Sequence, residues 1–187
     1  MNDEITDKSK ISLANFYNKN KILIISTLII IILSIIILII IDGYKEKNNI
    51  KVSEQFNKAK ILIENNNQQQ GLEILEKIIF KNNKFYSPSA LNLIIDKNLI
   101  KDKTKILYYF DLIIKNKKLD PEIKNLFIFK KIIYIGEDIE ENKLLNTLSP
   151  IIQSNSLWKN SALDFIKKYY LSKGEFNKAK EFETKMN

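Results

Sequence analysis

The longest apolar run in the chain covers residues 22–41, where twenty consecutive positions carry no charge. Its only polar members are Ser26, Thr27 and Ser34. A helix of that length is about 30 Å long, which matches the hydrocarbon core of a bilayer. A core helix of a small soluble domain normally keeps one polar face, and this run has none. The pattern therefore predicts a single transmembrane helix over residues 22–41.

The segments around this run define the rest of the organisation. The run is longer than the roughly 7–15 apolar residues of a signal peptide, and no small-residue cleavage site follows it, which favours an uncleaved anchor. Residues 1–21 then form a short tail, and residues 42–52 form a linker or an extension of the helix. Lysines occur on both sides, so charge does not decide the orientation. A long downstream segment can cross a membrane largely regardless of its charge, which permits a cytoplasmic tail and an external domain.

Residues 53–187 have a helical pattern throughout. Apolar residues recur at intervals of three and four, as at Ile74 and Ile78, and no long stretch alternates with period two. Ser87-Pro88 and Asp120-Pro121 each offer an N-cap side chain followed by proline at the first helical position. We predict an all-α domain of antiparallel helices, with breaks at residues 65–69, 81–88, 115–121, 136–138 and 153–156.

The stretch "SKGEFNKAKEF" at residues 172–182 resembles the turn and second helix of a tetratricopeptide repeat. Gly174 is expected to close the first helix in a left-handed conformation, as is Gly136 after its own helical run. If Ala179 faces the first helix of its hairpin, the equivalent positions, spaced by 35, 35 and 38 residues, are Gly71, Ile106 and Glu141. The spacing predicts a short solenoid of about four degenerate helical hairpins. The alternative is an irregular helical bundle without true repeats.

The composition excludes much of the usual catalytic chemistry. The chain has a net charge of +8, all thirty basic residues are Lys, and it contains neither His nor Cys. Imidazole bases, thiolate nucleophiles and ordinary zinc sites are therefore ruled out. The acidic group at residues 137–141 lacks calcium-loop spacing and is interpreted as a solvated turn beside a helix N-terminus. We expect a protein that is not an enzyme and that has no cofactor or metal.

Binding is the function class that remains. If the first helices of the hairpins line a concave face, a groove mixing lysines with apolar side chains could hold a partner segment, with candidate residues Phe56, Lys60, Leu91, Ile95, Leu126, Lys130 and Lys168. The plainer interpretation, which the sequence favours, leaves the lysines solvated and the apolar side chains in the core. Trp158, Tyr169 and Tyr170 are expected to pack the last hairpin. Scattered lysines without any Arg argue against nucleic acid, although a lysine-driven lipid or nucleic-acid binder is a third hypothesis.

Several stretches resemble one known family. These are "FYNKNK" (16–21) before the span, "FYSPSALNLIID" (85–96), and "SLWKNSALDFIKKYYLSKGEFNKAKEF" (156–182). Over nearly its whole length the chain resembles the tetratricopeptide-repeat-like ancillary SecYEG translocon subunit family of bacterial envelopes. It departs from that pattern in the bulky Ile94 and Phe129 at small positions and in "NNNQQQG" in place of a Gly-Asp turn.

The resemblance implies a single-span protein of the bacterial inner membrane with its repeat domain in the periplasm. The implied partners are translocon subunits, a periplasmic foldase or a nascent client, and no catalytic residues are implied. The same architecture would also suit an assembly scaffold for another envelope complex, such as cytochrome maturation or outer-membrane biogenesis.

Overall fold

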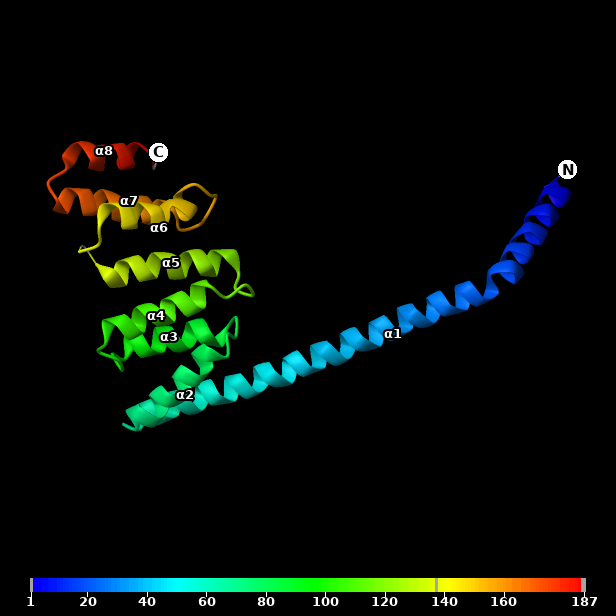
Figure 1. Ribbon diagram of the computed structural model, residues 1–187, viewed down its shortest axis with the longest axis horizontal. Coiled ribbons are helices and arrows are strands. Elements are labelled where there is room, and N and C mark those ends of the chain that lie inside the picture. The colour runs from blue at the N-terminus through cyan, green and yellow to red at the C-terminus, as the bar shows by residue number, and fades with distance from the viewer. Residues whose placement is uncertain (1, 137, 186–187) are drawn as a thin grey trace. The chain divides into compact units, whose positions relative to one another are not determined.

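In the computed structural model, the described residues are 2–136 and 138–185, with side chains described at residues 19–23 and from residue 25 onward. These residues form helices and connecting loops without any strand, which confirms the predicted all-α class (Figure 1). The helices are α1 (Asn2–Glu64), α2 (Gln68–Phe80), α3 (Tyr86–Asp96), α4 (Lys103–Ile114), α5 (Pro121–Ile135), α6 (Glu141–Ile152), α7 (Lys159–Ser172) and α8 (Phe176–Thr184). The chain divides into two compact units, residues 1–50 and residues 51–187.

The first unit contains the apolar run. Within the described residues, α1 contains the one stretch that is long and apolar enough to cross a membrane. The large apolar side chains described there are 43–86% exposed. Ser26, Thr27 and Ser34 donate hydrogen bonds to carbonyls three or four residues earlier in the same helix. Because these hydroxyls are satisfied inside the helix, the run needs no polar partner outside it, as a lipid environment requires.

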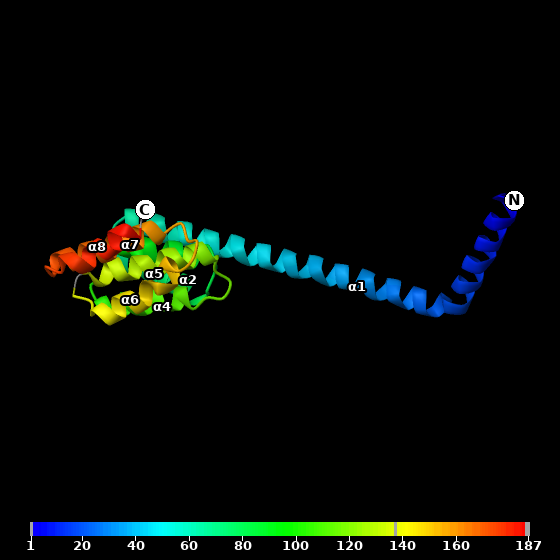
Figure 2. The same ribbon diagram turned by 90° about the horizontal axis from the view of Figure 1, so that it is seen from above.

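The second unit consists of helical hairpins. Residues 51–64 of α1 pair with α2, and α3, α5 and α7 pair with α4, α6 and α8 (Figure 1). The second helices of these hairpins begin at residues 68, 103, 141 and 176, which are 35, 38 and 35 residues apart. Figure 2 shows α4 and α6 along one side of this unit, with α7 along the other.

The fourth residue of each second helix marks equivalent positions in the hairpins. There the backbone N–H donates to the carbonyl of the residue that precedes the helix, and the residue is buried, at Gly71, Ile106, Leu144 and Ala179. The predicted equivalent Glu141 is therefore wrong by three residues. The cause lies in the third hairpin, whose first helix α5 has 15 residues where α3 has 11.

The core of this unit has two parts that meet at α5. Phe127 of α5 packs with Phe110 of α4 in the first part, with ring centroids 6.1 Å apart. Phe129 of α5 packs edge-on against Phe165 of α7 in the second part, also at 6.1 Å. These two aromatic residues on α5 therefore connect the first two hairpins to the last two.

Three helix starts test the capping predictions. Asp120 caps α5 as predicted, because its carboxylate accepts the N–H groups of Glu122 and Ile123 at 2.8 and 3.3 Å. Ser87 is not a cap. It lies inside α3, buried, and its hydroxyl donates to the carbonyl of Ile78 at 2.7 Å. Asp102 caps α4 in the same way as Asp120, and the sequence pattern missed it.

The helix ends show where glycine is required and where asparagine replaces it. Gly174 has φ +76°, and its N–H and that of the next residue return to α7, which closes the helix as predicted. Gly136 has φ +84° but ψ −163°, outside the predicted left-handed region. Three other helix ends have an asparagine with φ between 49° and 63°, namely Asn66, Asn82 and Asn98. The sequence pattern did not predict them.

Candidate functional site

A groove between α3 and α5, with α4 beneath it, holds a cavity of about 300 Å³. Two of the predicted groove residues, Ile95 of α3 and Lys130 of α5, line it. The other lining residues are Asn92, Asp96, Phe110, Ile133 and Tyr134. The cavity thus joins the first helices of two successive hairpins, which is where the sequence placed a binding face.

The floor and one wall of this groove are aromatic and aliphatic. The rings of Phe110 and Tyr134 lie 5.9 Å apart, and Ile133 beside them is 50% exposed. An exposed aliphatic side chain on such a floor loses water when a partner side chain covers it, which favours binding. The groove can therefore receive an apolar side chain.

The other side of the groove is polar. The Lys130 ammonium donates to the side-chain oxygen of Asn92 at 2.9 Å and lies 5.7 Å from the centroid of the Phe127 ring. These contacts hold the ammonium in place, and a Lys has three donors, of which this bond uses one. A carboxylate or carbonyl oxygen of a bound segment could accept another. The arrangement combines an apolar floor with a positioned cation.

The remaining predicted groove residues do not line the cavity. Leu91 is fully buried in the core, as the plainer interpretation expects, and does not contribute to the groove. Phe56 packs against Tyr86 with centroids 5.8 Å apart, and Leu126 packs half-buried against the first core group. The lysines Lys60 and Lys168 are exposed, and Lys168 pairs with Asp164 at 2.7 Å.

Of the groove residues that the sequence missed, Ile133 and Tyr134 lie on α5. They follow Lys130 at three and four positions, so all three share one face of α5. The predicted positions were counted back from Glu141, which is three residues out of register. Eleven residues before the correct reference, Leu144, stands Ile133. The same count back from Ile106 gives Ile95 in the preceding hairpin. Counting from Leu144 instead of Glu141 would therefore have identified Ile133 from the sequence.

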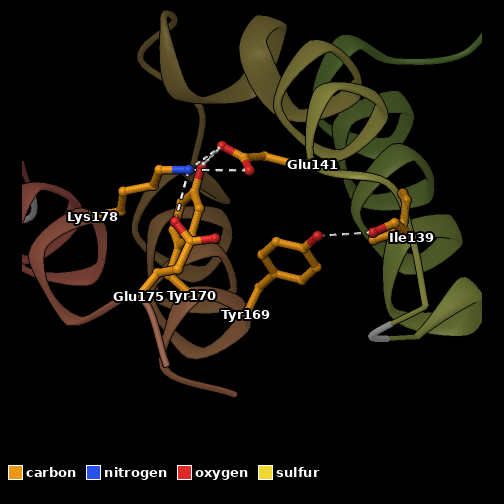
Figure 3. A network of polar contacts seen from close by, with 6 residues as sticks. All are labelled: Ile139, Glu141, Tyr169, Tyr170, Glu175 and Lys178. Atoms are coloured by element: carbon orange, nitrogen blue, oxygen red, sulfur yellow. Dashed lines mark hydrogen bonds and ion pairs between the residues drawn. The ribbon is translucent and has the colours of Figure 1, made fainter. Parts of the chain in front are cut away.

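A second polar arrangement connects the last two hairpins (Figure 3). Glu141, at the start of α6, accepts hydrogen bonds from the Tyr170 hydroxyl at 2.9 Å and from the Lys178 ammonium at 2.9 and 3.2 Å. Lys178 also pairs with Glu175 at 2.7 Å. Nearby, the Tyr169 hydroxyl donates to the carbonyl of Ile139 at 3.0 Å. Three helices and the α5–α6 loop are thereby connected.

These contacts shift the protonation equilibria of the groups involved. Hydrogen bonds from Lys178 and Tyr170 hold the pKa of Glu141 below its usual value. Burial, together with the bond to Glu141, raises the pKa of Tyr170 to about 12. Hydrogen bonds to Glu175 and Glu141 raise the pKa of Lys178. Each charge faces an opposite charge or a hydroxyl, so the arrangement stabilises the packing of the last hairpins.

The first two hairpins have the same combination of residue types. Glu76 of α2 accepts from the hydroxyl of Tyr109 at 2.8 Å and pairs with Lys105 of α4 at 2.6 Å. Burial and the bond to Glu76 raise the pKa of Tyr109. A Glu–Lys–Tyr group therefore connects α2 to α4, as another connects α6 to α7 and α8.

The acidic turn has no metal-site geometry among the residues that the structure describes, where no three potential ligands come together. Glu137, part of the acidic group in the sequence, lies outside the described residues. Comparison of the chain with protein-family models, with curated proteins and with solved structures finds no match. The function is therefore argued from the residues and their geometry.

Proposed function

We propose that this chain is a membrane-anchored, tetratricopeptide-repeat-like interaction protein, and that it serves as an ancillary subunit of the Sec translocon that links it to periplasmic chaperones. The groove between α3 and α5 is the observation that carries the proposal. It offers an apolar floor and a positioned Lys130 across two successive hairpins. Stacked hairpins present such faces to extended or helical segments of partners.

The repeat-like character is supported by the spacing of the hairpins. Second helices that begin 35, 38 and 35 residues apart lie close to the roughly 34-residue period of tetratricopeptide repeats. The buried residues at the fourth position of these helices recur with the same spacing. Only Gly71 and Ala179 among them are small, so these repeats would be degenerate ones.

The anchor is supported by the apolar part of α1. Its length and composition suit a membrane span, and its hydroxyls are satisfied within the helix. An anchored binding protein meets its partners at the high local concentration of a membrane surface, so a modest groove suffices. The proposed location is the bacterial inner membrane with the repeat domain in the periplasm, and the family resemblance of residues 85–96 and 156–182 supports it.

In this proposal a partner segment places an apolar side chain over Ile133 and Tyr134, and one of its carboxylates accepts from Lys130. A cavity of about 300 Å³ holds only one or two side chains. A groove that holds so small a part of a partner suits a protein that hands over a nascent client or recruits a foldase.

A second candidate function keeps the same architecture but assigns the protein to a different envelope complex. The same groove and anchor would suit an assembly scaffold for cytochrome maturation or outer-membrane biogenesis. The identity of the captured partner separates the two functions, because no residue of the groove does so.

The test is crosslinking in intact cells followed by identification of the proteins bound to the full chain. We expect translocon subunits or a membrane-bound periplasmic foldase. Recovery of only unrelated envelope complexes would contradict the translocon function and favour the scaffold. A reporter fused after residue 187 that is active only outside the cytoplasm checks the orientation. Its activity in the cytoplasm alone would contradict the periplasmic placement.

A further inference from the structure

The loops of the second unit lie along two edges that differ in charge (Figure 1). The loops that follow α2, α4 and α6, at residues 81–85, 115–120 and 153–158, form one edge, which we name the lysine edge. These loops contain five lysines and one acidic residue. The described loop residues of the opposite edge, at 65–67, 97–102, 136, 138–140 and 173–175, contain three lysines and four acidic residues. Positive charge is therefore concentrated on one edge.

Hydrogen bonds from one loop to the next, and from the third loop to the first turn of α5, fix this edge. The Asn116 side-chain amide donates to the carbonyl of Asn82 at 2.9 Å, across an interval of 34 residues. The Glu122 carboxylate accepts from the Ser156 hydroxyl at 2.9 Å and from the Leu157 N–H at 3.0 Å. The three loops are thus held together, and the five lysines, which all lie in the first two loops, form one surface.

A shallow cavity of about 350 Å³ lies on the lysine edge between the first two loops. Lys84 and Lys118 line it together with the apolar Phe85, Leu119 and Ile123. Its one acidic lining residue, Asp120, is occupied as the cap of α5. None of the ion pairs among the described residues involves Lys84 or Lys118. Two ammonium groups that no ion pair engages therefore stand beside apolar walls, and Asp120 is the single carboxylate of this lining.

Exposed apolar side chains also stand on this edge. Phe85 is 58% exposed and Leu157, in the third loop, is 82% exposed. An edge that carries both lysines and protruding apolar side chains suits the interfacial region of a bilayer, where phosphates meet the first methylene groups. Nucleic acid offers phosphates but no apolar layer for an aliphatic side chain such as Leu157.

The chain also enters the second unit at this edge. Lys81 donates to the side-chain oxygen of Gln55 at 2.6 Å, so the beginning of the segment 51–64 lies beside the first loop of the lysine edge. Only thirteen residues, 42–54, connect the apolar run to Gln55, and this connection spans at most about 50 Å even when extended. The edge is therefore kept within reach of the bilayer in which the run is proposed to lie.

We infer that the lysine edge binds an anionic phospholipid surface, with a headgroup phosphate between Lys84 and Lys118 and with Phe85 and Leu157 at the interface. This inference goes beyond the proposed partner binding and rests only on its membrane anchor. Docking would hold the domain at the bilayer while leaving the groove between α3 and α5 on another part of the surface.

The test uses the full chain in nanodiscs of phosphatidylcholine, with or without phosphatidylglycerol. Because the chain has no Cys, Asn155→Cys in the third loop gives a single site for an environment-sensitive fluorophore. We expect blue-shifted emission in the anionic nanodiscs and its loss at high salt. Replacing Lys84, Lys117 and Lys118 together by Gln should lower the docked-to-undocked ratio by about 100-fold. Matched replacement of Lys97, Lys101 and Lys173, on the opposite edge, should leave the emission shift in place.

Equal emission in both nanodiscs, or equal loss in the two triple variants, would overturn the inference. Capture of a labelled oligonucleotide that only the lysine-edge variant loses, without a response to anionic lipid, would overturn it in favour of nucleic acid. Co-elution of the chain with the nanodiscs is scored separately. Its failure would contradict the anchor of the proposed function and, with it, the tether on which this inference depends.

Discussion

The hydroxyl of Tyr170 donates a hydrogen bond of 2.9 Å to the carboxylate of Glu141, and this contact joins α7 to the beginning of α6. Tyr170 is almost fully buried, and its ring stacks on Phe182 of α8 at 5.6 Å. A second Tyr–Glu pair, Tyr109–Glu76, at different positions of its hairpins, joins α4 to α2. The two pairs show how hairpins with few small residues still pack side by side.

Removing the Tyr170 hydroxyl should weaken the last two hairpins. In Tyr170→Phe the ring packing stays and the hydrogen bond to a charged carboxylate is lost, so we expect the free energy of unfolding to fall by about 1 kcal/mol. Denaturant unfolding of the full chain in detergent, followed by circular dichroism, measures this change. The control is Tyr108→Phe, because Tyr108 is 50% exposed. Equal stability of the two variants would contradict the role of this bond.

The lowered pKa of Glu141 predicts an acid-dependent loss of stability. Above its unfolded value of 4.5 the carboxylate is charged in both states. As pH falls below 4.5 the unfolded state takes up the proton first, so stability falls through the folded pKa. Glu141→Gln should lack this part of the pH dependence, whereas Glu181→Gln, an exposed carboxylate on α8, should keep it. Unfolding curves between pH 3 and 6 compare them, and parallel curves for the wild type and Glu141→Gln would refute the assignment.

Gly71 is required by the close approach of α1 and α2. An added Cβ would lie 2.5 Å from Cγ1 of Ile63 and 3.0 Å from the carbonyl oxygen of Ala59. Such overpacking costs about 1–3 kcal/mol, more than the roughly 1 kcal/mol that Ala gains over Gly inside a helix. We therefore expect Gly71→Ala to lower the free energy of unfolding, by about 1 kcal/mol. Gln70→Ala, at an exposed neighbouring position, is the control, and a more stable Gly71→Ala would contradict the packing described.

Asn98 occupies a left-handed position with φ +49° at the end of α3. Asn98→Gly should leave the free energy of unfolding nearly unchanged, because Gly adopts positive φ without a steric penalty. Asn98→Ala should lower it by about 1 kcal/mol, because a residue with a Cβ is disfavoured at positive φ, and among such residues Asn adopts this conformation most readily. Asn146→Ala, at an exposed position inside α6, should instead gain a few tenths of a kcal/mol. Thermal unfolding of the three variants distinguishes these signs. A stabilised Asn98→Ala would show that the turn does not need this conformation.

The sequence predicted the helix boundaries best where a proline marked them. The cap Asp120 was predicted because a proline, Pro121, follows it. The cap Asp102 was not predicted because Lys103 follows it in place of a proline. At Ser87 the proline misled, since the loop before α3 is capped by Asn83, whose side chain accepts two backbone N–H groups. A local motif thus predicts a cap only when the helix has not already begun before it, as α3 has at Tyr86.

The register of the third hairpin could not be found from periodicity alone. The added residues of α5 continue an apolar helical pattern, so no gap in the sequence reveals them. The groove was consequently predicted in part, with Ile95 and Lys130 but without Ile133. The left-handed conformation of the three asparagines was also not predicted. Asn is abundant throughout this chain, so its presence at a position does not distinguish the few residues that close helices.

The central claim, that the groove between α3 and α5 binds a protein partner, is tested most directly by site-specific photocrosslinking from residue 133. A photoreactive amino acid at Ile133, which is 50% exposed in the groove, should give adducts with translocon subunits or a periplasmic foldase in living cells. The same amino acid at Ile61, 56% exposed on α1 outside the groove, should not. Adducts of equal yield at both positions, or none at position 133, would contradict the account.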